Sequence, residues 1–343
     1  MAIDIDTDTD TDTDTDTADP ARRSAVTLRV LHETSYAYDA PVELAHHLGH
    51  LRPRDTPLQR VCEWQLSVAP QPDVADAEAE ADADAFDPRV MVTQGVHQSV
   101  DPWGNHRASF SHSRVHDRLV VMSSFVVEIA PRPVLQPERS PPWEAVAERL
   151  RYRPGAGFDE AVEFTLGSAY APREASLARF AALVFRPGTP LIAGALAMMH
   201  LIFRHFAYKP LATSVNTRAP EALAQRQGVC QDFAHVMIGA MRSIGLAARY
   251  VSGYLLTRPP PGQPRLIGAD ASHAWVSVWC PVHGWVALDP TNAVPAGTDH
   301  VTLAWGRDYA DVAPLRGVIR GGGRAEPRVA VTVEPLAQAS DPA

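Results

Sequence analysis

Hydrophobic and polar positions predict a strand-rich region in the first part of the chain. Apolar side chains alternate with polar ones, or form short apolar runs, in four segments: 26–32, 61–68, 119–122 and 125–129. Alternation with a period of two is typical of a strand with one buried face, and short apolar runs are consistent with buried strands. We therefore predict a β-sandwich-like N-terminal domain over residues 26–135, with an acidic, alanine-rich insertion at residues 73–87.

Helical periodicity begins after a proline-rich connector at residues 131–142. Apolar residues recur at spacings of three and four in the segments 143–150, 176–185 and 191–206, and a short helix is predicted at 221–226. The same spacing runs through residues 229–244, where Gly245 follows as a stop signal. These patterns predict helices that pack their apolar faces against a common core.

A β-hairpin is predicted after the last of these helices. An aromatic-rich strand ends near Trp279, the turn-like sequence Pro-Val-His-Gly follows at 281–284, and a second strand covers 285–289 before Pro290. We place a second domain, with these helices and this hairpin, at residues 136–336. Residues 337–343 are left as a C-terminal tail.

Cys230 occupies the first turn of the helix predicted at residues 229–244. Gly228 allows the backbone to turn sharply just before it. Unpaired N–H groups and the positive end of the helix dipole converge there, and both favour the thiolate over the thiol. A buried structural cysteine is the alternative, and it is the better interpretation of an average helical cysteine. The hairpin that follows changes this balance.

His273 and Asp289 lie at matching ends of the two predicted hairpin strands. If Trp275 lies opposite Asp289, the two side chains share a face as diagonal neighbours about 7–8 Å apart. This register requires an odd-length loop or a one-residue bulge near Pro281, because a symmetric four-residue loop would place them on opposite faces. A nucleophile, a base and a carboxylate that orients the base make a thiol triad, so Cys230, His273 and Asp289 are candidate catalytic residues.

Net charge is distributed unevenly along the chain. Its 343 residues carry a formal charge of −9, but residues 4–19 hold eight acids and residues 73–87 hold seven, with no lysine or arginine in either stretch. Removing these 15 from the 40 acids leaves 25 against 31 lysines and arginines, so the remaining chain is mildly basic. No arginine stripe or aromatic platform accompanies this charge, and we expect no nucleic-acid binding.

The first residues form an Asp-Thr repeat of low complexity that cannot bury apolar surface, which predicts a disordered tail over residues 1–25. The repeat lacks the glycine and the terminal glutamate of a calcium loop. Neither a signal-peptide pattern nor an apolar run of membrane length is present, and three cysteines make no disulfide framework. We therefore expect a cytoplasmic protein without membrane contact, and the oligomeric state stays open.

Histidines gather in the predicted N-terminal domain, where His46 and His50 have the i, i+4 spacing that binds metals on a helix. Prolines flank this segment and disfavour a helix, and no carboxylate occupies a ligand-like position. We interpret these histidines as structural or surface residues, and we predict neither a metal nor a cofactor. Cys62 and Cys280 are interpreted as core residues of strands.

Several sequence blocks resemble the bacterial transglutaminase-like superfamily. They are Gly-Val-Cys-Gln-Asp-Phe-Ala at 228–234, Ala-Arg-Tyr-Val-Ser-Gly-Tyr at 248–254, Ser-His-Ala-Trp-Val at 272–276 and Trp-Val-Ala-Leu-Asp-Pro-Thr-Asn at 285–292. Residues 27–134 also resemble the β-rich N-terminal region often fused to this core, and residues 302–314 resemble its closing segment. The resemblance extends from about Val26 to Pro335.

This resemblance implies a papain-like α+β core in which Cys230, His273 and Asp289 act, in that chain order, as a catalytic triad. In the resembled family an aromatic donor upstream of the cysteine contributes to the oxyanion site, and Tyr208 occupies about that place. The implied reaction is thiol-dependent acyl transfer from a glutamine carboxamide or a peptide bond of a protein or peptide substrate, through a thioester.

The same residues are compatible with more than one outcome. An amine acceptor would make the enzyme a transferase, whereas water would make it a cysteine peptidase or amidase. A non-catalytic interaction module that retains the fold is a hypothesis of another class. A metal-dependent hydrolase is a third hypothesis, and it would need several histidines to converge. Because all three triad candidates are present, we favour the thiol enzyme.

Overall fold

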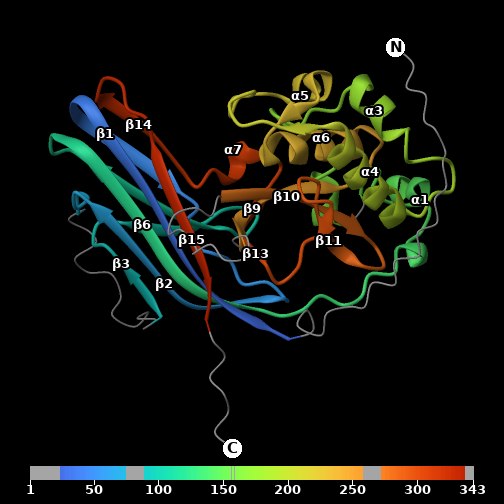
Figure 1. The fold of residues 1–343 in the computed structure, drawn as a ribbon, viewed down its shortest axis with the longest axis horizontal. Coiled ribbons are helices and arrows are strands. Elements are labelled where there is room, and N and C mark those ends of the chain that lie inside the picture. The colour runs from blue at the N-terminus through green and yellow to red at the C-terminus, as the bar shows by residue number, and fades with distance from the viewer. Residues whose placement is uncertain (1–23, 75–88, 156, 158, 258–271, 337–343) are drawn as a thin grey trace, which may run out of the picture.

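The computed structural model describes residues 24–74, 89–155, 157, 159–257 and 272–336. Nearly all of the predicted acidic tail, most of the acidic insertion and the whole C-terminal tail lie outside these ranges. Figure 1 shows two parts, one built of long strands and one in which helices cover a second sheet. The predicted α+β class with an N-terminal sheet domain is confirmed.

An eight-stranded sheet forms the first part of the molecule. Six strands come from the N-terminal region: β1 (Val26–Gly49), β2 (Gln59–Ala69), β3 (Val90–Val92), β4 (His97–Val100), β5 (His106–His112) and β6 (His116–Ile129). Their order is β3-β2-β6-β1-β5-β4. Residues alternate between buried and accessible along β1 and β2, as the sequence pattern predicted, so that Leu28, Val30, Trp64 and Leu66 enter one core.

Two C-terminal strands complete this sheet. β14 (Leu315–Gly321) pairs with the second half of β1, and β15 (Arg328–Pro335) pairs with its first half, both antiparallel. From the sequence we assigned residues 315–335 to the core, but their backbone hydrogen bonds join them to the N-terminal sheet. The alternation of a strand shows that it has a buried face and does not show which strand it pairs with.

The second part contains helices and a five-stranded sheet. The helices are α1 (Trp143–Arg149), α2 (Glu160–Glu163), α3 (Ala175–Ala181), α4 (Leu191–His205), α5 (Ala219–Gln225), α6 (Cys230–Ser243) and α7 (Tyr309–Val312), with a 3-10 turn at Pro137–Arg139. The strands are β9 (Ala248–Leu255), β10 (Ser272–Cys280), β11 (Gly284–Asp289), β12 (Val294–Pro295) and β13 (His300–Gly306), in the order β12-β11-β10-β9-β13. Among the described residues, no helix is long and apolar enough to span a bilayer.

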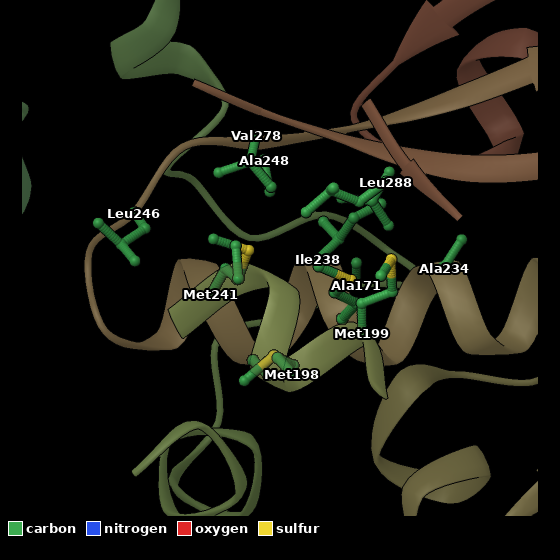
Figure 2. Close-up of a cluster of buried hydrophobic side chains, with 14 of the residues drawn as sticks. Ala171, Met198, Met199, Ala234, Ile238, Met241, Leu246, Ala248, Val278 and Leu288 are labelled. Carbon is green, nitrogen blue, oxygen red and sulfur yellow. The ribbon is translucent and has the colours of Figure 1, made fainter. Parts of the chain in front are cut away.

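Helix α6 is held where the second sheet and α4 meet. Figure 2 shows apolar side chains of α6, the strands and α4 gathered in one cluster, with Ala234, Ile238, Met241, Ala248, Val278, Leu288, Met198 and Met199 among those labelled. Each of these side chains is fully buried. Burying a leucine-sized side chain contributes about 1.5–3 kcal/mol, so α6 is held firmly and the position of its first residue is well defined.

Amide side chains of the N-terminal sheet cover the outer edge of β13. The Gln59 amide donates to Thr302 O at 2.7 Å and accepts the Thr302 N–H at 2.8 Å. Asn105 makes the same pair with Trp305, at 2.8 and 3.0 Å. An uncovered edge strand would leave these backbone groups open to another chain. The guanidinium of Arg54 also lies 3.2 Å from the centre of the Trp305 ring, so the two parts are joined through β13.

Candidate active site

Cys230 is the first residue of α6, as predicted, and its side chain is half-buried. Val229 before it is extended, and Gly228 has a φ of +154°, a conformation that favours glycine. The Val229 N–H donates to Asp232 Oδ2 at 2.8 Å, which pairs one donor of the helix start. A Cβ on Gly228 would collide with that same carboxylate. The local sequence thus determines where the helix begins and puts the thiol at its N-terminus.

The hairpin of β10 and β11 brings His273 next to Asp289. The strands pair Cys280 with Gly284 across a three-residue loop, residues 281–283. The odd-length loop required by the predicted register is confirmed. His273 Nε2 donates to Asp289 Oδ2 at 2.7 Å. The two residues are 16 positions apart in the chain, and they meet because they lie on the same face of two paired strands.

Cys230 is the second group, besides Asp289, that acts on the His273 ring. Because Asp289 uses Nε2 of His273, Nδ1 is the ring nitrogen left for the thiol. Burial by itself would lower the pKa of His273, but the hydrogen bond to Asp289, the neighbouring Cys230 thiol and the charges of both groups raise it to about 10. The surroundings of this ring therefore favour imidazolium at neutral pH.

Asp289 has a fully buried carboxylate that accepts hydrogen bonds on both oxygens. Oδ2 accepts from His273, from Asn292 Nδ2 at 2.6 Å and from His300 Nε2 at 3.2 Å, and Oδ1 accepts from the N–H groups of Thr291 and Asn292 at 2.9 and 3.3 Å. Burial opposes the negative charge, but the hydrogen bonds from His273, His300 and Asn292 hold the pKa of this carboxyl below its usual value. Asp289 is therefore an ionised and firmly oriented group.

His300 and Asn292 belong to this cluster, although we did not predict them. His300 Nδ1 accepts the Gly297 N–H at 3.2 Å, so the ring carries its proton on Nε2 and directs it at Asp289. Asn292 could have been found, since it follows Asp289 by three residues in a turn. His300 could not, because β13 and β11 are not neighbours in the sheet and only the folded chain brings them together.

Distance alone would allow His273, Asp289 and His300 to hold a metal ion, since one ligand atom of each lies within 4.8 Å of the others. A histidine ligand needs an unprotonated nitrogen toward the metal and donates its other N–H outward. His300 has the opposite arrangement, because a backbone N–H donates to its outer nitrogen. We therefore interpret this cluster as a set of hydrogen bonds around a carboxylate.

Tyr208 lies in the short strand β7 (Ala207–Tyr208), which pairs in parallel with β8 (Gln227–Gly228) just before Cys230. Its ring meets the edge of Phe233, with ring centres 6.3 Å apart. Burial and the charge of Cys230 raise the pKa of its phenol, so the hydroxyl stays protonated at neutral pH. Its role as an oxyanion donor stays a prediction.

The two residues after Cys230 contact the segment between β7 and α5. Gln231 Nε2 donates to Val215 O at 3.0 Å. Asp232 accepts the Thr213 hydroxyl at 2.6 Å together with the Val229 N–H, and burial raises the pKa of its carboxyl. Asp232 therefore stabilises the helix start and ties a neighbouring segment to it.

The other cysteines and the paired histidines have separate surroundings. Cys280 is buried in the core, as predicted, but Cys62 is only half-buried. The core interpretation of Cys62 was wrong because the register of β2 with β6 shifts at this residue and leaves it without a partner across the strands. His46 on β1 contacts a serine hydroxyl, and His50 is buried beside Asp101. Neither histidine lies on a helix.

Two family models match the chain. The model described as the transglutaminase-like superfamily matches residues 178–290, a range that contains Cys230, His273 and Asp289. The model described as the bacterial transglutaminase-like N-terminal region matches residues 28–128, most of the first sheet.

Proteins of several bacteria are similar to this chain. An uncharacterized protein of Mycobacterium bovis is 37% identical over 298 residues, which cover 85% of this chain and 87% of that protein. The protein-glutamine gamma-glutamyltransferase of Pseudomonas aeruginosa is 37% identical over 123 residues, or 33% of this chain and 18% of that enzyme. A crystal structure described as a candidate cysteine protease from Cytophaga hutchinsonii has a TM-score of 0.69, with 19% identity and 93% of each chain covered. At that identity the likeness shows the fold.

Proposed function

The chain belongs to the transglutaminase-like superfamily, and from that premise we propose that it catalyses acyl transfer through a thioester on Cys230. The superfamily and its relatives support a thiol-dependent acyltransferase or peptidase in general. One observation carries the finer proposal: the His273 ring is hydrogen-bonded at 2.7 Å to the buried carboxylate of Asp289, and Cys230, the first residue of α6, is the other group that acts on this ring. A thiol at a helix N-terminus beside a charged imidazole is the arrangement that thiol nucleophiles need.

In the first half of the reaction, the Cys230 thiolate attacks the carbonyl carbon of a carboxamide. The C–N bond breaks, a C–S bond forms, and His273 transfers its Nδ1 proton to the leaving ammonia or amine. In the second half, His273 takes a proton from the acceptor as the acceptor attacks the thioester carbonyl, and the thiolate leaves. Asp289 stays ionised throughout, holding the ring orientation and stabilising the imidazolium.

Backbone and side-chain donors around Cys230 would stabilise the oxyanion. Its own N–H lies in the first turn of α6, and no hydrogen bond joins it to another described residue. The Tyr208 hydroxyl is the second donor in this proposal, because the pairing of β7 with β8 places Tyr208 beside Gly228, two residues before Cys230. Two donors of this kind contribute most when they are already in place before charge develops.

Protein or peptide carboxamides are the proposed substrates, with a glutamine side chain as the acyl donor. The similar Pseudomonas enzyme is named a protein-glutamine gamma-glutamyltransferase, which favours this donor over a backbone peptide bond. Hydrolysis through the same thioester is the runner-up, since water and an amine use the same three residues. A non-catalytic module would not require an ionised carboxylate with five hydrogen-bond donors behind a half-buried thiol.

Trapping of the acyl-enzyme tests this proposal. The protein is incubated with acetylated glutamine peptides, quenched in acid and weighed intact, and the products are compared with and without a primary amine. We expect an adduct of the peptide mass less ammonia, bound at Cys230. An amine-linked product marks a transferase, and glutamate formed in the presence of the amine marks a hydrolase.

Matched cysteine variants complete the test. Cys230→Ala should abolish the adduct, whereas Cys62→Ala, which removes a half-buried thiol from β2, should leave it intact. An adduct that persists in Cys230→Ala, or wild-type protein that forms none with any carboxamide, would overturn the proposed function.

A further inference from the structure

The segment between β7 and α5, residues 209–218, lies against the start of α6. Three hydrogen bonds, each to a residue within two positions of Cys230, hold it there: Lys209 N–H to Gly228 O at 2.8 Å, the Thr213 hydroxyl to Asp232 at 2.6 Å, and the Gln231 amide to Val215 O at 3.0 Å. The segment is therefore a border of the candidate active site and follows any movement of the nucleophile's helix.

This border turns apolar side chains toward solvent. Tyr208 at its start is 54% exposed, Val215 is 56% exposed and Leu211 is completely exposed. Single exposed apolar residues are ordinary on protein surfaces. Here three of them lie within eight positions of chain, and Tyr208 pairs with Gly228, two residues before Cys230. Apolar surface is thus available beside the start of α6, where Cys230 lies.

Leu211 also has a backbone conformation that leucine avoids. Its φ is +68°, in the left-handed region, which is strained for a residue other than glycine. Its side chain does not compensate for this strain by packing, because it is fully exposed. Backbone strain held in place by surrounding hydrogen bonds concentrates at binding sites. The conformation and exposure of Leu211 therefore do not stabilise the fold, which makes this residue the candidate for binding within the border.

We propose that Leu211, together with Tyr208 and Val215, forms a subsite for an apolar side chain that flanks the reacting glutamine of a peptide or protein acyl donor. This inference rests on the proposed function. The acyl donor is the occupant because it forms the thioester at Cys230, and the three tethers of the segment all end on residues around that cysteine. Covering the exposed leucine with an apolar side chain removes both from water.

The variant Leu211→Asn tests the subsite. Asparagine tolerates the left-handed conformation, so the backbone of the segment is retained while the apolar surface is lost. The rate constant for acyl-enzyme formation is measured, without an amine acceptor, for two acetylated peptides in which either leucine or serine flanks the glutamine. We expect about a tenfold loss for the leucine peptide and no change for the serine peptide, the size expected for one partly buried leucine side chain.

Two controls separate this effect from damage to the site. Alkylation of Cys230 by iodoacetamide, which needs no subsite, should proceed at the wild-type rate in Leu211→Asn. The matched variant Val318→Asn replaces an apolar residue that is 77% exposed on β14, and it should leave both peptides unaffected.

The outcomes distinguish the subsite from the function on which it rests. Wild-type protein that forms no acyl-enzyme contradicts the proposed function. If the wild-type protein is acylated and Leu211→Asn reacts with both peptides at the wild-type rates, the subsite alone is overturned. An equal loss of rate for both peptides also overturns it, because that result indicates a general effect on the loop. The subsite is likewise overturned if Leu211→Asn changes only the sedimentation coefficient of the protein, because that result indicates a contact between copies of the chain.

Discussion

At the residue scale, the candidate site is organised by the charge of Asp289. Five hydrogen-bond donors surround this buried carboxylate, and two of them are histidine rings that share its Oδ2. His273 is the ring that can carry the charge, because Asp289 uses only its Nε2 and leaves Nδ1 for the thiol. Because Nδ1 of His300 accepts a backbone N–H, the ring proton is on Nε2 and is donated to Asp289. His300 therefore orients the carboxylate. The two histidines therefore have different roles at one aspartate.

The raised pKa of His273 predicts how the proposed activity changes at alkaline pH. Its folded-state pKa of about 10 lies above the ordinary 6.5, so the charged ring contributes stability that is complete below about pH 6.5 and is lost as the pH rises through about 10. Acylation needs this proton for the leaving amine. We expect kcat/KM with a glutamine peptide to fall tenfold per pH unit above about 10, measured across pH 6–11.

Alkylation of the thiol provides the comparison for this profile. Iodoacetamide requires no proton from His273, so its rate constant with Cys230 should not fall in the same range. Circular dichroism at each pH checks that the protein stays folded. A fall of kcat/KM centred near pH 7, with intact secondary structure, would contradict the raised pKa.

At the element scale, the start of α6 depends on a match between a glycine and an aspartate. The Asp232 carboxylate folds back onto the Val229 N–H, and it occupies the space that a side chain at Gly228 would need. The same carboxylate holds Thr213, so the helix start and the segment beside it form one unit. Cys230 lies in the middle of this unit, so the hydrogen bonds on either side of it fix its backbone position.

The variant Gly228→Ala is expected to damage this unit selectively. The added Cβ collides with Asp232, and the φ of +154° is strained for alanine. We expect a loss of about 1–3 kcal/mol in the free energy of unfolding, measured by urea denaturation, with a larger relative effect on acylation. The double variant Gly228→Ala/Asp232→Ser should recover part of the stability. A single variant with wild-type stability and acylation would show that the contact is unimportant.

At the scale of the whole molecule, β13 belongs to the second sheet and is also hydrogen-bonded to residues of the N-terminal part, so it connects the two sheets. Its inner edge pairs with β9, and its outer edge is covered by Gln59 and Asn105 from the N-terminal sheet. β13 also begins with His300, which reaches Asp289. The N-terminal sheet therefore contacts the strand that carries His300, and β14 and β15 return to β1 after that strand.

Asn105→Ala tests this coupling. The change leaves the Trp305 backbone pair without partners and removes the acceptor of Arg54. Unpaired buried backbone groups cost about 1–3 kcal/mol each, so we expect the melting temperature of the whole chain to fall by about 5 °C in one calorimetric transition. The surface variant Gln98→Ala, which loses an exposed contact to Arg52, should melt with the wild type. A second transition that separates from the first would show that the two sheets unfold independently.

The amino-acid sequence alone determined the local elements and pointed to three candidate catalytic residues. Helix α6 and the hairpin were predictable because their apolar periodicities and their glycine and proline stops are local properties. A shared face for His273 and Asp289 required an odd-length loop or a bulge, and the structure has the odd-length loop.

Only the tertiary structure determined which strands pair and which side chains come into contact when they are separated in the chain. The pairing of β14 and β15 with β1, the closure of β13 by Gln59 and Asn105, and the arrival of His300 at Asp289 involve partners 11 to more than 300 residues apart. Strand alternation specifies which face is buried and leaves the partner unspecified, and a histidine carries no local sign of the carboxylate that it will contact. These contacts were therefore settled only when the whole chain packed around its two sheets.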